Sequence, residues 1–311
     1  MDYIINITCE PAGTCWCTAA RQVCCSGTVT TKIMRIEFTF PENLSPEELQ
    51  STLQDDIRIH AEPQQTIQRT YYDSFDSRLY LDGSLLEDNR IGNSHTLVWR
   101  SLRGEDRCPR LKSGTFPRFA CDFPQGPFRE QLEAVLEMRE LLPLFRVRSR
   151  VTSLRILNRD EKTVAWLKLE ENTLPRQRGV RPGTLDSRAI ITPVRGFSKP
   201  CTALAKRLKQ RGLVPAEDDL MLSVLSRLDR KPGSYSSKLK LSLDPTMRAD
   251  QASKLIFQRL LDIMLQNEAG TRTATDTEFL HDFRVAIRRT RSALTQIKAC
   301  LLYTSPSPRD C

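Results

Sequence analysis

Two alternating segments in the middle of the chain place the strongest constraint on its fold. Residues 144–158 (LFRVRSRVTSLRILN) and 162–171 (KTVAWLKLEE) each alternate apolar with polar side chains, and only a turn at 158–161 separates them. A period of two is typical of β-strands, and strands joined by so short a turn pair in the antiparallel direction. The pattern therefore predicts a long antiparallel hairpin.

Segments on both sides of this hairpin extend the pattern. Ser45, Pro46 and Glu48 form a capping box, which predicts that a short helix begins there. An amphipathic helix is expected over 126–142. Further strands are expected over 32–40, within 66–88, and over 94–102 and 187–197. Residues 34–200 are thus expected to form an α+β domain built on an antiparallel sheet.

The pattern becomes helical after residue 200. Residues 201–245 are expected to contain a short basic helix up to 212 and then a connecting stretch interrupted by prolines. A long helix is expected over 246–269 and to end at Gly270, and Thr275 with Glu278 is interpreted as the capping box of a second helix. Residues 246–299 are thus expected to form a helical hairpin.

Basic residues are concentrated on one face of that second helix. At about 100° per residue, His281, Arg284, Arg288 and Arg291 fall within an arc of about 80°. Like charges at this spacing repel one another, and no acid lies on the arc, so a bound polyanion would relieve the repulsion. The alternative is a basic helix face that is exposed to solvent and binds no ligand. Sequence-specific DNA reading is disfavoured because no helix-turn-helix pattern is present.

Alternation also places Arg146, Arg148 and Arg150 on one face of the first strand of the hairpin. Such a row is common on a solvated sheet. In a closed barrel, however, alternate residues point inward, and an inward row of arginines could clamp an anion. Both interpretations remain open at this point.

Composition agrees with an anionic partner. The formal net charge is +9 and the isoelectric point is about 9.1, which favours nucleic acid, polyphosphate, nucleotides or an anionic membrane without choosing among them. No apolar run is long enough to span a bilayer, and no basic-led apolar segment of signal-peptide type opens the chain. We therefore expect a cytoplasmic protein without a membrane partner.

Both ends of the chain depart from these patterns. Five of the ten cysteines lie in the first 25 residues, with spacings that do not match a four-ligand zinc site. We interpret residues 1–33 as a disordered or spurious leader. Residues 300–311 (CLLYTSPSPRDC) abandon the helical pattern, and we interpret them as a tail foreign to the native protein.

The C-terminal helices resemble the start of a CHAD domain, an all-helical module. The stretch DTEFLHDFRVAIRRTRSAL carries the signature H-D-x-R-V-x-x-R-R-x-R-S. The resemblance implies binding of inorganic polyphosphate, with no reaction attached, through His281, Arg284, Arg288, Arg289 and Arg291. A full CHAD domain is far longer, so the hairpin is expected to be truncated and to expose apolar side chains at Leu260, Phe283, Ile287 and Leu294.

Residues 33–200 resemble a CYTH domain, the triphosphate-tunnel fold. The resemblance rests on Tyr72, Asp73, Asp76, Leu79, Gly83 and Leu86 in YYDSFDSRLYLDGSLL, on the basic strand LFRVRSR and on Arg100. It implies an antiparallel β tunnel that binds triphosphate-type anions. The tunnel phosphate-binding residues expected from it are Arg100, Arg146, Arg148, Arg150 and Lys168.

The first strand departs from the CYTH pattern, which has E-x-E-x-K there. Here the strand reads MRIEFTF, so only Glu37 remains, and Glu170 could add a second carboxylate. Divalent-metal chemistry on a triphosphate needs carboxylates that hold Mg²⁺ or Mn²⁺ beside the phosphates. We therefore expect a degenerate tunnel that binds phosphate and contains no catalytic residue. A metal-dependent triphosphatase that uses Glu37 and Glu170 is the alternative.

Overall fold

The computed structural model describes residues 35–114, 116–194 and 196–297 of the chain. All of these residues belong to one compact unit, Ile33–Cys311. The expected leader at 1–33 and tail at 300–311 lie outside the described residues, so the interpretation of both stays a prediction.

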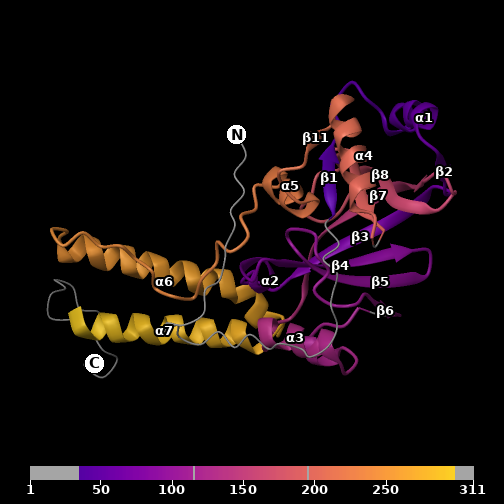
Figure 1. Cartoon of the computed structure of the whole chain (residues 1–311). Helices are drawn as coiled ribbons and strands as arrows, with labels where there is room; N and C mark the ends of the chain where they lie inside the picture. The colour runs from indigo at the N-terminus through magenta and orange to yellow at the C-terminus, as the bar shows by residue number, and fades with distance from the viewer. Residues whose placement is uncertain (1–34, 115, 195, 298–311) are drawn as a thin grey trace, which may run out of the picture. The chain divides into compact units, whose positions relative to one another are not determined.

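One large antiparallel sheet dominates the described part of the chain (Figure 1). Its strands follow the order β11-β1-β10-β8-β7-β3-β4-β5-β6, with β2 paired to β7 and β9 paired to β8. Their bounds are β1 Ile36–Thr39, β2 Ile59–Ala61, β3 Gln65–Asp73, β4 Ser84–Ile91, β5 Ser94–Ser101, β6 Leu111–Ser113, β7 Leu142–Leu157, β8 Thr163–Leu174, β9 Gly183–Thr184, β10 Arg188–Pro193 and β11 Val214–Pro215. The predicted α+β class is confirmed.

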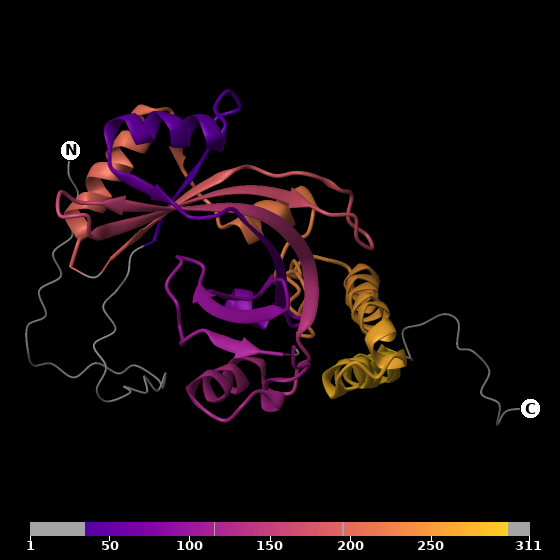
Figure 2. The same cartoon turned by 90° about the vertical axis from the view of Figure 1, so that its right-hand side faces the viewer.

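The predicted long hairpin is the pair β7 and β8 at the centre of this sheet. The side-chain oxygen of Asn158 accepts hydrogen bonds from the backbone N–H groups of Asp160 and Lys162, which closes the turn between the two strands. The sheet bends strongly, so that its β1–β10 end and its β4–β5 end face each other (Figure 2). Among the described residues, no strand pairing joins β6 to β11, so hydrogen bonds do not close the sheet into a barrel.

Helices cover the outer surfaces of the sheet. Helix α1 (Pro46–Asp56) begins with the predicted capping box of Ser45 and Glu48. It packs with α4 (Ser198–Gln210) over one apolar core, while η1 (Ala120–Asp122) and α3 (Pro127–Leu136) cover a second core near β4 and β5. Apolar packing against the sheet therefore continues beyond residue 200, where the sequence suggested a boundary.

A further helix lies in the stretch that was expected only to connect. Helix α5 (Leu220–Arg227) begins at Asp219, whose carboxylate accepts a hydrogen bond from the backbone N–H of Met221. Its residue Val224 is fully buried and belongs to the same apolar cluster as Tyr71 of β3. A segment of eight residues between helix-breaking prolines is too short for its periodic pattern to predict a helix. Packing against the sheet stabilises α5.

The turn after β3 uses two of the residues that carry the CYTH resemblance. The Asp73 carboxylate accepts hydrogen bonds from the backbone N–H groups of Ser74, Leu79 and Tyr80, and so holds the short helix α2 (Arg78–Leu81) against the strand. Burial raises the pKa of Asp73 to about 6, although these hydrogen bonds oppose the rise. The role of Asp73 in this structure is to shape the turn.

The C-terminal hairpin consists of α6 (Ala249–Arg272) and α7 (Thr277–Ile297), and two details differ from expectation. Gly270 lies inside α6, where a Cβ atom would come within 2.3 Å of the Phe279 ring, so it permits close packing and does not end the helix. The cap of α7 is Asp276, whose Oδ1 accepts hydrogen bonds from the N–H groups of Glu278 and Phe279. Asp276 lies beside Thr275, and both residue types are common caps.

The exposure of apolar side chains on the hairpin meets the expectation for Ile287 and Leu294, whereas Phe283 is half-buried and Leu260 is buried. Phe279, Asp282 and Ala286 are buried, whereas Ile287 is 36% and Leu294 43% exposed. Leu260 was expected to be exposed and is instead buried in α6, facing Ala286 in a small apolar cluster. Other exposed apolar side chains of the hairpin are Leu255, Leu261, Leu265 and Leu280.

Arg139, which follows α3, connects the sheet region to this hairpin. Its buried guanidinium pairs with Asp76 at 3.3 Å, Asp276 at 3.3 Å and Asp282 at 2.9 Å. The hydroxyl of Tyr235 also donates a hydrogen bond to Asp282. Asp282 of the CHAD signature is therefore a buried structural residue. Among the described residues, no helix is both long and apolar enough to cross a membrane.

Candidate functional site

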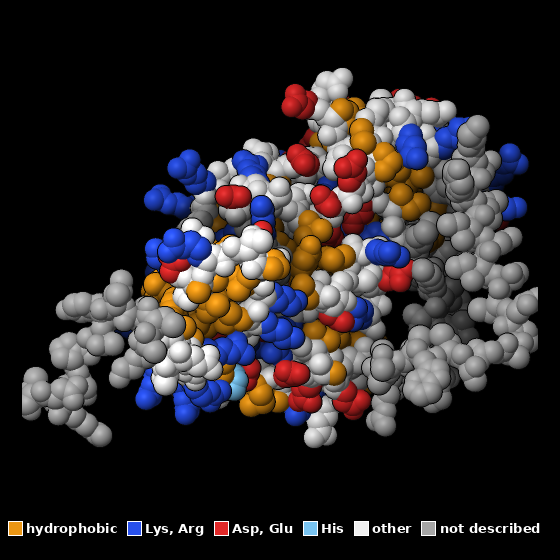
Figure 3. Space-filling view, turned by 90° about the vertical axis from the view of Figure 1, so that its left-hand side faces the viewer, with side chains coloured by type: hydrophobic (Ala, Val, Ile, Leu, Met, Phe, Trp, Pro, Cys, Tyr) orange, Lys and Arg blue, Asp and Glu red, His pale blue; other side chains and the backbone are white. Residues whose placement is uncertain are grey.

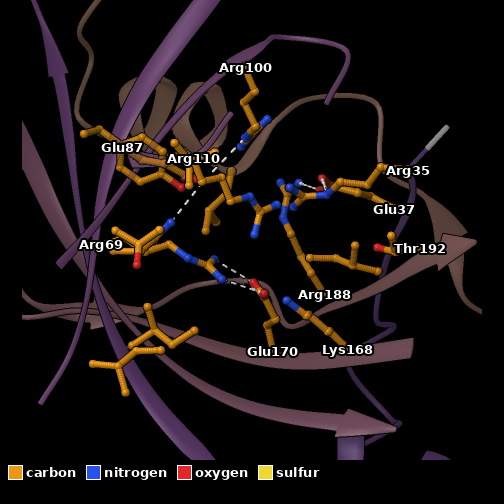
Figure 4. Close-up of a pocket in the computed structure, with 18 residues that line it drawn as sticks. Arg35, Glu37, Arg69, Glu87, Arg100, Arg110, Lys168, Glu170, Arg188 and Thr192 are labelled. Carbon is orange, nitrogen blue, oxygen red and sulfur yellow. Dashed lines mark hydrogen bonds and ion pairs between the residues drawn. The ribbon is translucent and has the colours of Figure 1, made fainter. Parts of the chain in front are cut away.

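The bent sheet encloses a cavity of about 200 Å³ that is lined by charged side chains. Strands β1, β3, β4, β5, β8 and β10 all contribute to its wall, and Figure 4 shows these side chains converging. The cations are Arg35, Arg69, Arg100, Arg110, Lys168 and Arg188, and the carboxylates are Glu37, Glu87 and Glu170. Six cations against three carboxylates leave the lining with a positive excess, which suits an anionic ligand.

Strand alternation explains why these residues share the cavity. On β3 the inward side chains are Ile67, Arg69 and Tyr71, and on β8 they include Lys168 and Glu170. Successive side chains of a strand point to opposite faces, so charged and apolar residues spaced by two reach the cavity together. The bend of the sheet then brings strands from its two ends to one space (Figure 2).

Arg69 and Glu170 form the tightest pair of the lining. Both terminal nitrogens of Arg69 donate to Glu170, each over 2.6 Å, and both side chains are buried. Burial alone would raise the pKa of Glu170, but the charge and hydrogen bonds of Arg69 outweigh it and lower that pKa to about 2. Glu170 is therefore ionised at neutral pH.

Glu37 is held between two arginines. Its Oε1 lies 2.6 Å from Nε of Arg35, and its Oε2 accepts a hydrogen bond of 3.1 Å from Nη1 of Arg188. Arg188 also donates to the backbone carbonyl of Asp218 and to the hydroxyl of Ser223. One carboxylate thus holds two guanidinium groups side by side at the cavity wall, as Figure 4 shows.

Arg100 is almost completely buried and only partly satisfied. Its Nη2 lies 2.7 Å from the Asp219 carboxylate, and its Nε lies 3.6 Å from Glu87. Burial would raise the pKa of Asp219, but the charge of Arg100 lowers it below its usual range. Among the described residues, Nε and Nη1 of Arg100 find no hydrogen-bond partner, and neither does Nε of Arg188. These are unused donors at the cavity.

The positions of the predicted tunnel residues divide into two groups. Arg100, Lys168, Glu37 and Glu170 do line the cavity. The prediction that Arg146, Arg148 and Arg150 line the interior is wrong, because all three are exposed on the outer face of β7. The inward positions of that strand are Val147, Ser149 and Val151, and they lie opposite or next to the inward residues of β3.

Five charged cavity residues were not predicted from the sequence: Arg35, Arg69, Glu87, Arg110 and Arg188. The segment QTIQRTY carried a usable signal, since Ile67, Arg69 and Tyr71 alternate with polar residues. A charged residue in the apolar register of a strand indicates a polar interior. The sequence around the other four residues does not show which way their side chains point, because the bend of the sheet decides which face is the interior.

The predicted metal ligands Glu37 and Glu170 do not fit a divalent cation as they stand. Glu170 is engaged by Arg69 through both oxygens, and Glu37 is engaged by Arg35 and Arg188. Within the described part of the chain, no three side chains of the His, Cys, Asp or Glu type gather as metal ligands. Mg²⁺ binds through carboxylates that are free to replace its water ligands, and these two are already paired with cations.

A second cluster of cations lies on α7. Arg284, Arg288 and Arg291 line one open groove with Ile287, Ser292 and Thr295, as the spacing predicted. His281 is exposed one turn earlier and does not line the groove, and Arg289 donates to the backbone carbonyl of Ser237 instead. On the face seen in Figure 3, Lys and Arg side chains lie beside a group of hydrophobic ones.

The groove on α7 falls in a segment with a recognisable family. Residues 255–307 match the CHAD domain family. The match includes most of α6, all of α7 and therefore the three groove arginines. No curated protein sequence matches the chain.

Several solved structures resemble the chain at low identity. A Hippeastrum protein named for adenylyl cyclase, and described as revealing a dominant triphosphatase activity, shares 14% identity over 65% of this chain and 99% of its own, with a TM-score of 0.43. A Vibrio parahaemolyticus protein named for adenylate cyclase shares 9% over 62% and 97%, with a TM-score of 0.39. A Bacillus halodurans protein of the same description shares 11% over 71% and 96%, with a TM-score of 0.36.

Proposed function

We propose that this protein binds polyanions, and that its main ligand is inorganic polyphosphate held in the groove of α7. The proposal rests on one observation: the guanidinium groups of Arg284, Arg288 and Arg291 line one groove. Within the described residues, none of the three has an ion-pair partner. A linear polyanion offers closely spaced oxygens along its length, and arginine binds phosphate oxygens in bidentate geometry.

The close spacing of the groove arginines favours binding over a merely solvated face. Arg110, Arg248 and Arg272 are exposed, and each lies within ion-pair distance of an acid a few residues away. Exposed arginines without an ion pair among the described residues also occur, for example Arg146 and Arg148 on β7. The three groove arginines repel one another, because they lie three and four residues apart on one helix. A bound polyanion would remove this repulsion.

The cavity in the sheet is a second phosphate site in this proposal. Its lining has an excess of cations, and buried Arg100 offers two donors without a partner in the described structure. A buried donor without a partner is unfavourable, and a phosphate oxygen in the cavity would supply the missing acceptor. The ligands proposed for this cavity are triphosphate-type anions.

Charge reversal on α7 tests the main proposal. The double variant Arg284→Glu/Arg288→Glu is expected to lose retention on immobilised polyphosphate, since two attractive contacts become repulsive. The matched control is Arg248→Glu/Arg272→Glu, which reverses the same number of charges at exposed positions of α6 or its N-terminal cap. This control should retain binding. Equal loss in both variants would show that only net charge matters, and unchanged retention in the first would move the site elsewhere.

Salt and competition measurements separate specific from general polyanion binding. Affinity for any polyanion should fall steeply as salt concentration rises, because binding releases counterions. Duplex DNA should compete poorly with polyphosphate of equal charge if the groove is shaped for a single phosphate chain. Competition on equal terms would instead favour nucleic acid as the ligand.

A metal-dependent triphosphatase is the second candidate, because Glu37, Glu87 and Glu170 all line the cavity. Phosphate release from inorganic triphosphate would be measured with Mg²⁺ or Mn²⁺. We expect no release above the background, since each carboxylate is near an arginine. Release that is abolished by Glu37→Ala would establish the enzyme.

A further inference from the structure

The carboxylates of the sheet cavity indicate which form of phosphate it takes. Oligophosphates exist in water both as free anions and as complexes with Mg²⁺, and a protein site selects between the two by its charges. A preference for one of these forms rests on the proposed role of the cavity as a phosphate site. It concerns the state of the ligand, which that proposal leaves open.

In this cavity, arginine side chains occupy the positions beside the carboxylates that a metal ion would otherwise take. The three lining carboxylates are each close to a guanidinium: Glu170 to Arg69, Glu37 to Arg35 and Arg188, and Glu87 to Arg100. A divalent cation bound at any of them would lie a few ångströms from a buried positive charge. Such repulsion is strong where water is largely excluded.

Glu37 is the carboxylate of the cavity that pairs with two cations. Arg35 and Arg188 approach its two different oxygens, at 2.6 Å and 3.1 Å. The cluster of Arg35, Glu37 and Arg188 therefore has a net charge of one positive unit. Nε of Arg188 is buried without a hydrogen-bond partner among the described residues. The cluster thus combines positive charge with an unused donor at the cavity wall.

Lys168 and Arg100 add hydrogen-bond donors to the cavity wall away from this cluster. Burial lowers the pKa of Lys168, while Glu170 opposes that shift. Among the described residues, Lys168 has no carboxylate within ion-pair distance, and Arg100 has two nitrogens without hydrogen-bond partners. These groups can bind phosphate oxygens directly, since ammonium and guanidinium groups donate to them without a bridging metal.

We propose that the cavity binds oligophosphate in its metal-free form, with the Arg35–Glu37–Arg188 cluster supplying the positive charge that a divalent cation would otherwise bring, and with Arg100, whose own charge is balanced by Asp219, supplying two unpaired N–H donors. Mg²⁺ bound to the ligand neutralises part of its charge and adds a cation to a cavity that already has an excess of them. Magnesium therefore opposes binding at this site.

Isothermal titration with inorganic tripolyphosphate tests the proposal. The full chain with Arg284→Ala/Arg288→Ala/Arg291→Ala removes the α7 groove, so that the cavity is the site measured. Titrations are run in EDTA and in excess Mg²⁺ at matched ionic strength. We expect the dissociation constant to be smaller in EDTA by about tenfold or more, the change that follows from losing one charge-assisted contact.

A pair of substitutions at Arg35 sharpens the test. Arg35→Glu places a carboxylate beside Glu37 and removes a cation, so we expect it to reverse the preference and bind more tightly in Mg²⁺. Arg35→Gln removes the cation without adding a carboxylate, and should weaken binding about tenfold in EDTA without reversing the preference. The Gln variant is the matched control for the loss of the arginine.

Three outcomes would overturn the proposal. If the Arg35-containing cavity binds tripolyphosphate only in Mg²⁺, the cavity takes the metal complex and the inference fails while its phosphate role survives. If Arg35→Glu and Arg35→Gln behave alike in Mg²⁺, the charge of the Arg35–Glu37–Arg188 cluster does not set the metal preference, and the inference fails. If no heat of binding appears in either condition, the cavity is not a phosphate site, and the function proposed for it fails as well.

Discussion

Arg69 of β3 and Glu170 of β8 are joined by two hydrogen bonds of 2.6 Å, although strand β7 lies between their strands in the sheet. The bend of the sheet allows two long side chains to meet over the intervening strand. Both are buried, so their charges are screened little by water. This pair links the stability of the fold to the electrostatics of the cavity.

Removal of one partner of this pair should destabilise the protein strongly. Glu170→Gln leaves the buried Arg69 without a counter-charge, and breaking a buried ion pair in this way costs about 3–5 kcal/mol. Urea unfolding followed by circular dichroism measures the change. The control is Glu171→Gln. Glu171 follows Glu170 in the chain and pairs with the exposed Arg150, and exposed pairs contribute about 0–1 kcal/mol. Equal losses in the two variants would contradict the assignment.

The same pair should make stability depend on acidic pH. The pKa of Glu170 is about 2 in the folded protein, below its ordinary value of 4.5. The stabilisation is then fully present above about pH 4.5 and is lost as the pH falls toward 2, because the unfolded chain takes up the proton first. Glu170→Gln should flatten the unfolding free energy between these pH values. A slope unchanged by the substitution would assign the acid sensitivity to other carboxylates.

The close packing of α6 on α7 depends on the absence of a side chain at Gly270. Glycine to alanine inside a helix ordinarily stabilises it by up to about 1 kcal/mol. At Gly270 the added Cβ would lie 2.3 Å from the Phe279 ring, so we expect a loss of about 1–3 kcal/mol instead. Thermal unfolding of Gly270→Ala measures it. The double variant with Phe279→Ala should recover part of the loss relative to Phe279→Ala alone.

Arg139 should hold the hairpin to the rest of the described structure. Arg139→Met leaves Asp76, Asp276 and Asp282 without their common cation, and we expect a loss of about 3–5 kcal/mol. Hydrogen exchange should show faster opening at the start of α7, where Asp276 and Asp282 lie. The control Arg272→Met removes an exposed arginine from α6, whose pair with Glu268 spans 3.8 Å, and should change little. Exchange that is unaltered at α7 would contradict the role of Arg139.

Local patterns predicted what depends on near neighbours in the chain. The β7–β8 hairpin, the capping box of Ser45 and Glu48, and the cationic face of Arg284, Arg288 and Arg291 all follow from spacing along one element. Each rests on geometry that repeats every two residues or every turn. The match of residues 255–307 to the CHAD domain family agrees with the signature found in that segment.

Errors arose where a choice between faces or partners was needed. Alternation showed that Arg146, Arg148 and Arg150 share a face, but either face could have been the interior. The cap of α7 was misplaced by one residue because Thr275 and Asp276 are both suitable caps, and packing of Arg139 and Glu140 against Asp276 favours the second. Helix α5 was missed because its stability comes from the sheet.

The sequence by itself determined most of the element types, the antiparallel hairpin and the row of arginines on α7, since these need only contacts between residues a few positions apart. Tertiary structure alone decided that Arg69 meets Glu170, that Arg35 and Arg188 share Glu37, and that Asp219 reaches Arg100. These partners lie on different elements, far apart in the chain for all but Arg35 and Glu37. The bend of the sheet brings them together, and it arises from the packing of the sheet and its helices as a whole.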